Sequence, residues 1–444
     1  MKVNNLKPRV GLAVIRSPYE KGMEKAEEML KKGLEVIDKR LGFFPIVFKE
    51  IIDNEKVSEE AAEYFEREEI DTLLIAFATW ADDTYVLPII ERLHDTSIAI
   101  WSWNYIETGS LVAGYQLSSI LKDLDIYFKF IPGELSSPEN LGKLRSMALA
   151  ATIKNRLYGT KIGIIGYQRI KGSTDVTFDE LELRKTFGVR IIAIGIDDLL
   201  DEINSVGSDE TKDVCDNILR KVKCIKVSKE QLEDSCKVYI ALKNIIKKYD
   251  LDAVTVECAY KFLGRVCLPF SLLIDEGYMC GCESDVRSTI VMLILYWLGN
   301  KPVLFAEPLF LNEEENSVIF SHCGAAPLSL ASNDKEACIV PMRLTGKGAV
   351  ITFTVKPQEY TLAALSGRKG NYRLLIGYGK GVPTDLLFEG NPVKVVFKTP
   401  IKDIVEKTTE EFGASRHWIL VPGNYVGELT ELAKLLSFKY KIIR

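Results

Sequence analysis

The stretch Thr72-Leu-Leu-Ile-Ala-Phe77 is a continuous aliphatic run of strand length. Similar short runs occur along the first third of the chain, at 10–15, 44–48, 98–101 and 126–131. Amphipathic helical patterns lie between or after these runs, at 22–40, 58–67 and 138–157. Strands that are apolar on both faces are typical of parallel sheets covered by helices on each side. This alternation therefore predicts an α/β domain built on a doubly wound parallel sheet.

The same alternation begins again at Gly159. Strands are expected at 162–166, 189–194 and 253–257, one helix at 179–187, two helices between 196 and 249, and another helix at 286–298. From about Lys301 the pattern changes to short β-rich runs separated by Gly, Pro and Asn, which is typical of an antiparallel barrel or sandwich. The sequence thus predicts two doubly wound α/β domains, at 1–158 and 159–300, followed by a β-rich, barrel-like domain at 301–444.

Length, charge and cysteine usage limit the classes of protein. A chain of 444 residues exceeds one ordinary core, and a net charge of −5 without a basic cluster gives no attraction to nucleic acid or anionic membranes. The first nine residues hold no apolar stretch of the signal-peptide type, and the apolar run at 289–298 is too short to span a bilayer. Nine cysteines without metal-finger spacing fit a reducing cytoplasm, where thiols serve as small core residues. We therefore expect a cytoplasmic, globular protein.

Four polar side chains stand at the margins of predicted apolar elements in the C-terminal part of the chain. Glu283 precedes the helix predicted at 286–298, and Glu307 follows the apolar strand 302–306. His322 and His417 are two of only three histidines; one ends a predicted strand and the other begins one. For each glutamate the alternative is a helix cap or a salt bridge, and for each histidine a hydrogen-bonded core position. All four residues stand at the margin of an apolar element, and this shared position favours one common site at the edge of a sheet.

Carboxylates with imidazoles, and no thiolate, are donors that suit Mn²⁺, with Mg²⁺, Co²⁺ or Fe²⁺ as alternatives. A carboxylate flanked by Phe305 and Pro308 needs a positive partner if it is buried, and either a divalent cation or an arginine would serve. Two glutamates beside one cation suggest proton transfer as well as metal binding. Such a site suits the enediol through which an aldose and a ketose interconvert.

Several segments resemble, in order and spacing, the metal-site segments of the L-fucose and L-arabinose isomerase superfamily. They are Cys282-Glu-Ser-Asp285, Phe305-Ala-Glu307, Ser321-His322 and Arg416-His-Trp418. Segments 161–166, 182–188, 343–348 and 422–436 also resemble this family, so the resemblance covers the chain from Lys161 onward. The first domain is similar in architecture only.

The resemblance implies a metal-dependent aldose–ketose isomerase that acts on a free sugar. Glu283 and Glu307 would be both metal ligands and the acid/base pair, and His417 would bind Mn²⁺. The arabinose branch implies His322 as a further ligand, and it also has Glu at the position of Glu307, where the fucose branch usually has Asp. The resemblance also implies a homo-trimer or homo-hexamer, in which the first domain reaches a neighbouring subunit's site.

Further residues are candidates for substrate binding, each with a structural alternative. Asp285 is a helix cap or a support for the metal site, and Arg287 holds a substrate group or is a solvated helix residue. Trp80 and Trp418 are aromatic faces that could stack on a sugar, or core residues. Two other functions fit the same residues: a sugar epimerase at the same site, or a non-catalytic sugar-binding or regulatory protein on the same fold. The sequence does not identify the sugar.

Overall fold

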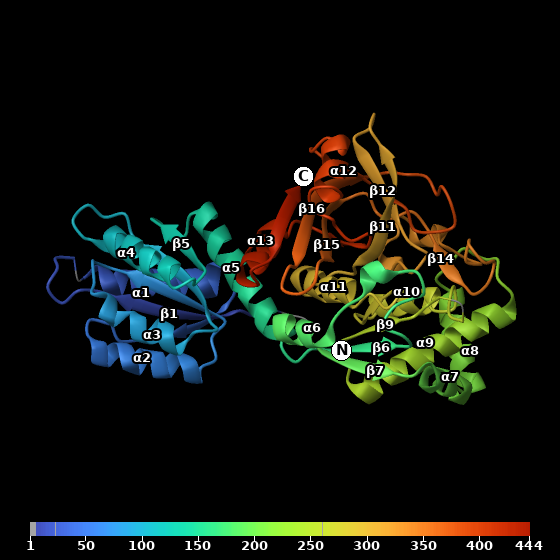
Figure 1. Cartoon of the computed structure of the whole chain (residues 1–444), viewed down its shortest axis with the longest axis horizontal. Coiled ribbons are helices and arrows are strands. Elements are labelled where there is room, and N and C mark those ends of the chain that lie inside the picture. Colours follow the sequence, from blue (N-terminus) through green and yellow to red (C-terminus); the bar gives the residue numbers. More distant parts are fainter. Residues whose placement is uncertain (1–5, 23, 260) are drawn as a thin grey trace. The chain divides into compact units, whose positions relative to one another are not determined.

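The computed structural model describes residues 6–22, 24–259 and 261–444, which form two compact units (Figure 1). The first unit holds residues 6–156 together with Gly427–Ser437, and the second holds Leu157–Val426 together with Phe438–Arg444. The end of the chain therefore contributes one helix to the first unit before it returns to the second.

Sheet A, the centre of the first unit, has five parallel strands in the order β2-β1-β3-β4-β5. The strands are β1 (Arg9–Ile15), β2 (Phe44–Val47), β3 (Thr72–Phe77), β4 (Ser97–Ser102) and β5 (Phe128–Pro132). The helices are α1 (Lys25–Glu35), α2 (Glu55–Arg67), α3 (Leu87–Arg92), α4 (Ser110–Asp123), α5 (Pro138–Leu157) and α13 (Val426–Leu435). Helices lie on both faces of this sheet in Figure 1, which explains why β3 and β4 are buried along their whole length.

Sheet B, in the second unit, has four parallel strands in the order β10-β9-β6-β7. The strands are β6 (Lys161–Ile165), β7 (Arg190–Ile194), β9 (Ala253–Val256) and β10 (Met279–Gly281). The helices are α6 (Glu180–Phe187), α7 (Ile196–Ser205), α8 (Ser208–Leu219), α9 (Lys229–Tyr249), α10 (Cys267–Asp275) and α11 (Val286–Gly299). Two parallel sheets with helices confirm the α/β class predicted for the first two thirds of the chain.

Sheet D is the strand-rich part of the second unit. Its strands are β11 (Leu304–Asn312), β12 (Ser317–Ser321), β15 (Glu359–Ser366), β16 (Arg373–Val382), β17 (Val393–Val396), β18 (Trp418–Pro422) and β19 (Lys439–Ile443). The order is β15-β18-β11-β12-β17-β16-β19, and a further pairing of β15 with β16 closes a ring of strands. Most neighbours are antiparallel, and β19 joins β16 in parallel. The barrel-like C-terminal sheet is therefore confirmed. One helix, α12 (Ile401–Thr408), lies between β17 and β18.

Helix α11 connects the two sheets of the second unit. It is apolar on all sides and almost wholly buried, because it packs on β9 and β10 of sheet B and also on β15 and β18 of sheet D. A single hydrophobic core joins residues of α8, α9 and α10 to the inward side chains of sheet D. The predicted domain boundary near residue 300 thus falls where the helices beside sheet B and the strands of sheet D share one hydrophobic core. The boundary stays a prediction.

The structure differs from the predicted elements in several places; α4 and α10, for example, were not predicted. Three helices, not two, lie between 196 and 249: extended backbone at Val206 and Gly207 separates α7 from α8, and a Ser228 capping box begins α9. The strand predicted at 302–306 continues to Asn312 as β11, because it pairs with β12 beyond an irregularity between Pro308 and Phe310.

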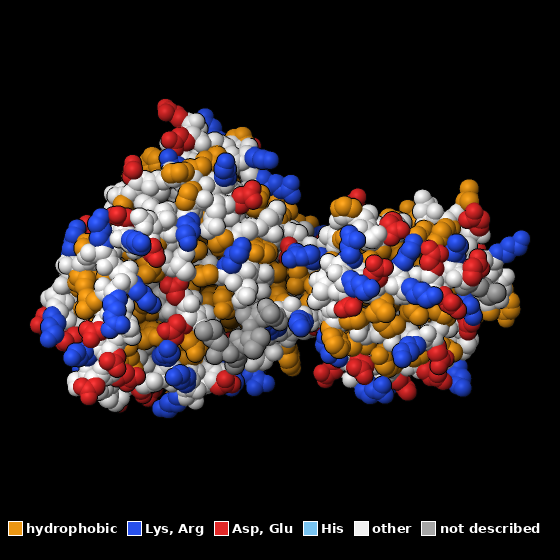
Figure 2. Space-filling view, turned by 180° about the vertical axis from the view of Figure 1, so that it is seen from behind, with side chains coloured by type: hydrophobic (Ala, Val, Ile, Leu, Met, Phe, Trp, Pro, Cys, Tyr) orange, Lys and Arg blue, Asp and Glu red, His pale blue; other side chains and the backbone are white. Residues whose placement is uncertain are grey.

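Two further features concern the charges on the surface and the length and apolar character of the helices. On the face shown in Figure 2, basic and acidic side chains are intermingled. Within the described ranges, no helix combines the length and the apolar character needed to cross a membrane.

Two cysteines depart from the expected role of small core residues. β8 (Cys224–Ile225) pairs with β13 (Cys338–Val340), which also pairs with β14 (Val350–Thr352) in sheet C. This register places Cys224 opposite Cys338, with Cα atoms 4.7 Å apart, and the two form a disulfide. Of the other cysteines, all are buried except Cys323, which is partly exposed.

We expect Cys224→Ser to lower the free energy of unfolding by about 2–5 kcal/mol, because the disulfide closes a loop of 114 residues in the unfolded chain. Denaturant titration measures this, and dithiothreitol should lower the wild-type midpoint to that of the variant without affecting the variant itself. Equal midpoints for the two oxidised proteins would show that the cross-link does not stabilise the fold.

Candidate active site

Glu283 lies in the short connection between β10 and α11, where the backbone adopts an unusual conformation. Glu283 and Ser284 have φ of 60° and 58°, in the left-handed region that non-glycine residues rarely occupy. Ser284 holds this conformation, since its N–H donates to the Val256 carbonyl (3.2 Å) and its Oγ donates to the Tyr167 carbonyl (2.8 Å). The connection is thereby fixed to the carboxyl end of sheet B.

The other three predicted ligands lie on adjacent strands of sheet D. Glu307 is in β11, opposite Ser321 of β12, so His322 directly follows its partner strand. On the other side, Ala306 lies opposite Trp418, which brings His417 beside Glu307. The strand order β18-β11-β12 therefore places two imidazoles on either side of one carboxylate. Phe305 packs against both rings, with centroids 5.2 Å from His322 and 4.6 Å from His417.

The structure brings all four predicted side chains together. His417 Nε2 is 3.8 Å from Glu283 Oε2 and 3.5 Å from Glu307 Oε1. His322 Nε2 is 3.8 Å from Glu283 Oε1 and 4.0 Å from Glu307 Oε2. One ligand atom each from Glu283, His322 and His417 lies within 4.8 Å of the other two. These separations are of the order expected for neighbouring donors around one cation, slightly expanded.

Both imidazoles have nitrogen atoms that the protein leaves unsatisfied. His417 Nε2 and both ring nitrogens of His322 are buried without a hydrogen-bond partner in the described part of the chain. Buried polar atoms of this kind are rare and call for an explanation. Burial, with a smaller contribution from the charge of His417, lowers the pKa of His322 to about 3, so this ring is neutral at pH 7. A neutral imidazole with a free lone pair is a metal ligand.

Asp285 connects the site to helix α11. Its Oδ1 accepts from the Ser288 N–H (3.1 Å), which makes it the N-cap, and its Oδ2 lies 2.8 Å from His417 Nδ1. Burial opposes the charge on this carboxyl, but the bond and charge of His417 hold the pKa of Asp285 below its usual range. The bond fixes the ring so that Nε2 faces the glutamates, as carboxylates do for metal-bound histidines. Asp285 is therefore a helix cap and the partner of His417, and its role as support for a metal site stays a prediction.

Arg416 was not predicted as a site residue, yet it lies at the centre of the charge network. Its guanidinium donates to Glu307 Oε1 (3.0 Å) and also to carboxylate oxygens of Glu283 and Asp175. Burial opposes this positive charge, but the charges of Glu283 and Asp175 raise the pKa of Arg416. An arginine was one of the partners expected for a buried glutamate, and only the position of Arg416 next to His417 pointed to this one.

The remaining candidates have other surroundings. Arg287 is buried, and its guanidinium donates to the backbone carbonyls of Gly367 (2.9 Å) and Asp175. Trp418 is buried in the core against Phe320. Trp80 belongs to the first unit, where it is partly exposed and its Nε1 donates to Gln116 (3.0 Å). A role of these three in substrate binding stays a prediction.

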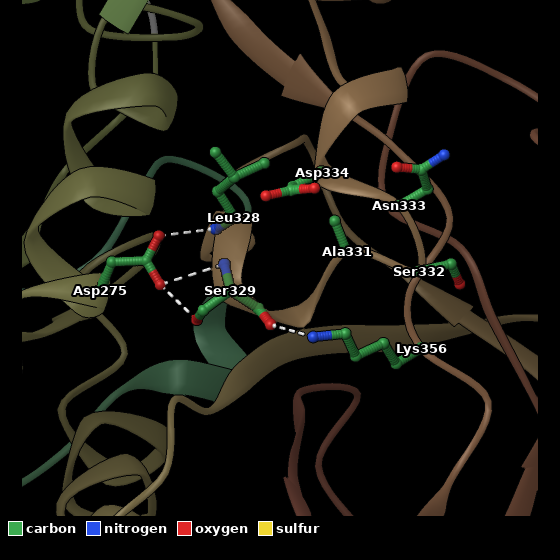
Figure 3. A pocket seen from close by; sticks show the side chains of 8 residues that line it. All are labelled: Asp275, Leu328, Ser329, Ala331, Ser332, Asn333, Asp334 and Lys356. Atoms are coloured by element: carbon green, nitrogen blue, oxygen red, sulfur yellow. Dashed lines mark hydrogen bonds between the residues drawn. The ribbon is translucent and has the colours of Figure 1, made fainter. Parts of the chain in front are cut away.

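A hollow near the end of α10 has a different character (Figure 3). Two acids line it, Asp275 and Asp334, and the carboxylate of Asp275 accepts from the N–H groups of Leu328 and Ser329 and from the Ser329 hydroxyl. The carboxylate of Asp275 thus caps a short 3-10 turn. The unsatisfied ring nitrogens of His322 and His417, beside Glu283 and Glu307, favour that cluster as the chemical site.

Known proteins share sequence with most of this chain. Sulfoquinovose isomerase of Priestia aryabhattai is 28% identical over 390 residues, which cover 84% of this chain and 85% of that protein. Sulfoquinovose isomerase of Alkalicoccus urumqiensis is 25% identical over 385 residues, covering 83% and 85%. L-arabinose isomerase 2 of Bacillus licheniformis is 22% identical over 332 residues, covering 71% and 70%. No protein-family model matches the chain.

The fold, the cluster of acids and imidazoles, and these relatives together define the class of protein: the chain is an enzyme, an aldose–ketose isomerase. Within that class it is related to the L-fucose and L-arabinose isomerase superfamily, which confirms the resemblance stated from the sequence.

We expect Asp285→Ala to lower the free energy of unfolding by about 2–4 kcal/mol, because the helix loses its cap and a buried imidazole loses its partner. Asp179→Ala is the matched control, since Asp179 caps the exposed start of α6 and should cost only about 1 kcal/mol. Denaturant titration of both variants gives the comparison. Equal losses would mean that the bond to His417 contributes nothing.

Proposed function

We propose that this isomerase is metal-dependent and acts through a cis-enediol intermediate. The observation that carries the proposal is the convergence of two carboxylates on two buried imidazoles, three of whose four ring nitrogens lack hydrogen-bond partners in the described ranges. In a purely structural cluster, buried nitrogens without hydrogen bonds would lower the stability of the fold and bring no functional advantage. Metal ligation accounts for them.

Glu283, Glu307, His322 and His417 would hold the cation, and their mixed oxygen and nitrogen donors suit Mn²⁺ best, with Mg²⁺, Co²⁺ or Fe²⁺ also compatible. When bound, such a cation supplies a Lewis acid that polarises a carbonyl and stabilises the negative charge of an enediolate. Asp285 would keep the His417 ring oriented toward it.

The two glutamates would carry the protons. In an aldose-to-ketose reaction, one carboxylate takes the proton from C2 and returns it to C1, while the other moves a proton from the C2 hydroxyl to the oxygen on C1. No electron acceptor is needed, because one carbon is oxidised as its neighbour is reduced. Arg416 contacts both glutamates and would keep them in place between these transfers.

The substrate we propose is a free aldose. The relatives that cover most of the chain are named for sulfoquinovose, an aldose with a sulfonate on its terminal carbon, and this favours an aldose of the same kind here. By the same resemblance we expect a homo-trimer or homo-hexamer, which sedimentation velocity would test. The cytoplasmic location, expected from cysteine usage, stays a prediction.

Glu283→Gln and Glu307→Gln should each lower kcat by about 10²–10⁴-fold, because an amide cannot exchange the proton that the reaction moves. The fold should remain, since the amide oxygen still accepts from Arg416. Glu314→Gln, in the exposed turn between β11 and β12, is the matched control and should keep wild-type turnover. Circular dichroism and a steady-state assay of all three variants suffice. Near-wild-type turnover in either active-site variant would refute the assignment.

Dialysis against EDTA should reduce turnover to background, and added Mn²⁺ should restore it, because the proposed Lewis acid would be removed and returned. Metal content measured by mass spectrometry should fall and rise in parallel. His322→Ala should weaken Mn²⁺ retention, which gives a readout that does not depend on turnover. Full activity of metal-free protein would contradict the proposal.

A further inference from the structure

Arg416 contacts the same carboxylate oxygens that a cation at the candidate site would use. His417 Nε2 lies 3.8 Å from Oε2 of Glu283 and 3.5 Å from Oε1 of Glu307. These two oxygens also accept from Arg416: Oε2 of Glu283 from a terminal nitrogen, and Oε1 of Glu307 from Nε at 3.0 Å. The guanidinium is therefore a positive group already bound to the oxygens that face His417.

Each glutamate presents its other oxygen to His322. Oε1 of Glu283 and Oε2 of Glu307 lie 3.8 Å and 4.0 Å from His322 Nε2. A cation held by the glutamates and the imidazoles would therefore share each carboxylate with Arg416. Two positive groups on one carboxylate divide its attraction and repel one another, more strongly in a partly buried site than in water. This repulsion would lower the affinity of the site for a cation.

Asp175 and Ser173 contact the same guanidinium. The carboxylate of Asp175 accepts from one terminal nitrogen of Arg416. The other terminal nitrogen, which donates to Glu283, also donates to the Oγ of Ser173 at 3.4 Å. Both residues belong to the segment between β6 and α6. A negative group on the guanidinium reduces the positive charge that acts on the glutamates. Asp175 is therefore positioned to control how strongly Arg416 competes with a cation.

We propose that Arg416 competes with the metal for Glu283 and Glu307, so that the enzyme binds its cation less tightly than its four ligands alone would allow. This inference rests on the proposed function. Arg416 is a positioning residue that acts through the two glutamates, and it holds them at the expense of metal affinity. Asp175 limits this competition, because it binds the same guanidinium.

Calorimetric titration of the metal-free, full-length protein with Mn²⁺ measures this competition without any turnover. Arg416→Gln should bind Mn²⁺ about 10-fold more tightly than the wild type, because the competing charge is removed. A residue that only supports the metal site has the opposite effect, since its loss typically weakens metal binding by about 10–100-fold. Arg416→Lys keeps the positive charge and should remain closer to the wild type than Arg416→Gln. Circular dichroism checks that each variant is folded.

The matched control is Arg368→Gln. Arg368 is exposed and lies in the same compact unit, so this variant loses an equal charge away from the two glutamates. Its affinity for Mn²⁺ should equal that of the wild type. A gain as large as in Arg416→Gln would show that net charge, and not the contact with the glutamates, sets the affinity, and the inference would then be wrong.

Asp175→Asn tests the same competition through the partner of Arg416. With Asp175 neutralised, the guanidinium acts more strongly on the glutamates, and Mn²⁺ should bind about 10-fold more weakly than to the wild type. In an Arg416→Gln background the same change should have an effect about 3-fold smaller or less, because it acts through Arg416. This double-mutant cycle separates the contact from the general effect of removing one negative charge.

The outcomes distinguish this inference from the proposed function. Weaker or unchanged Mn²⁺ binding by folded Arg416→Gln overturns the inference and leaves the metal dependence intact. An equal effect of Asp175→Asn in both backgrounds does the same. If neither the wild type nor any variant binds Mn²⁺, the proposed function fails and the inference fails with it.

Discussion

A single buried carboxylate holds the candidate site together. Asp285 caps α11, which packs on sheet B, and it also holds His417, which begins a strand of sheet D. It thereby connects the helix that follows Glu283 to the strands that carry Glu307 and the imidazoles. Without this bond the buried imidazole of His417 would lose its orientation, and the helix would lose its first-turn acceptor. Through these two contacts of Asp285, sheet B and sheet D meet at the candidate site.

Charge balance is the second constraint, because two partly buried glutamates repel one another unless a cation lies between them. Arg416 supplies one positive charge to both, and Asp175 in turn balances Arg416. Burial keeps His322 neutral, so this imidazole adds a donor without adding positive charge. The cluster is therefore suited to a cation of charge two.

Much of this could be predicted from the sequence, and the failures have physical causes. β3 and α5 were predicted with their observed bounds, since a continuous aliphatic run and a long helical pattern are strong local signals. The break between α7 and α8 was missed, because it depends on extended backbone at Val206 and Gly207 rather than on composition. The rarity of histidine and the position of each residue at the end of an element were enough to predict the four side chains that cluster in the structure. Arg416 and Asp175 could not be selected in this way, because their importance arises from contacts between segments more than two hundred residues apart.

The backbone at Glu283 and Ser284 shows that the fold gives up stability at this site. Two consecutive left-handed residues cost about 1–3 kcal/mol each, and neither is glycine. Hydrogen bonds from Ser284 to Val256 and Tyr167 hold the strained connection, and the buried helix α11 behind it prevents relaxation. Glycine would relieve the strain at the second position, but only an acid side chain at the first can face the two imidazoles. A relaxed loop would turn the Glu283 carboxylate away from His322 and His417. The strained backbone therefore remains, because it keeps this carboxylate facing both imidazoles.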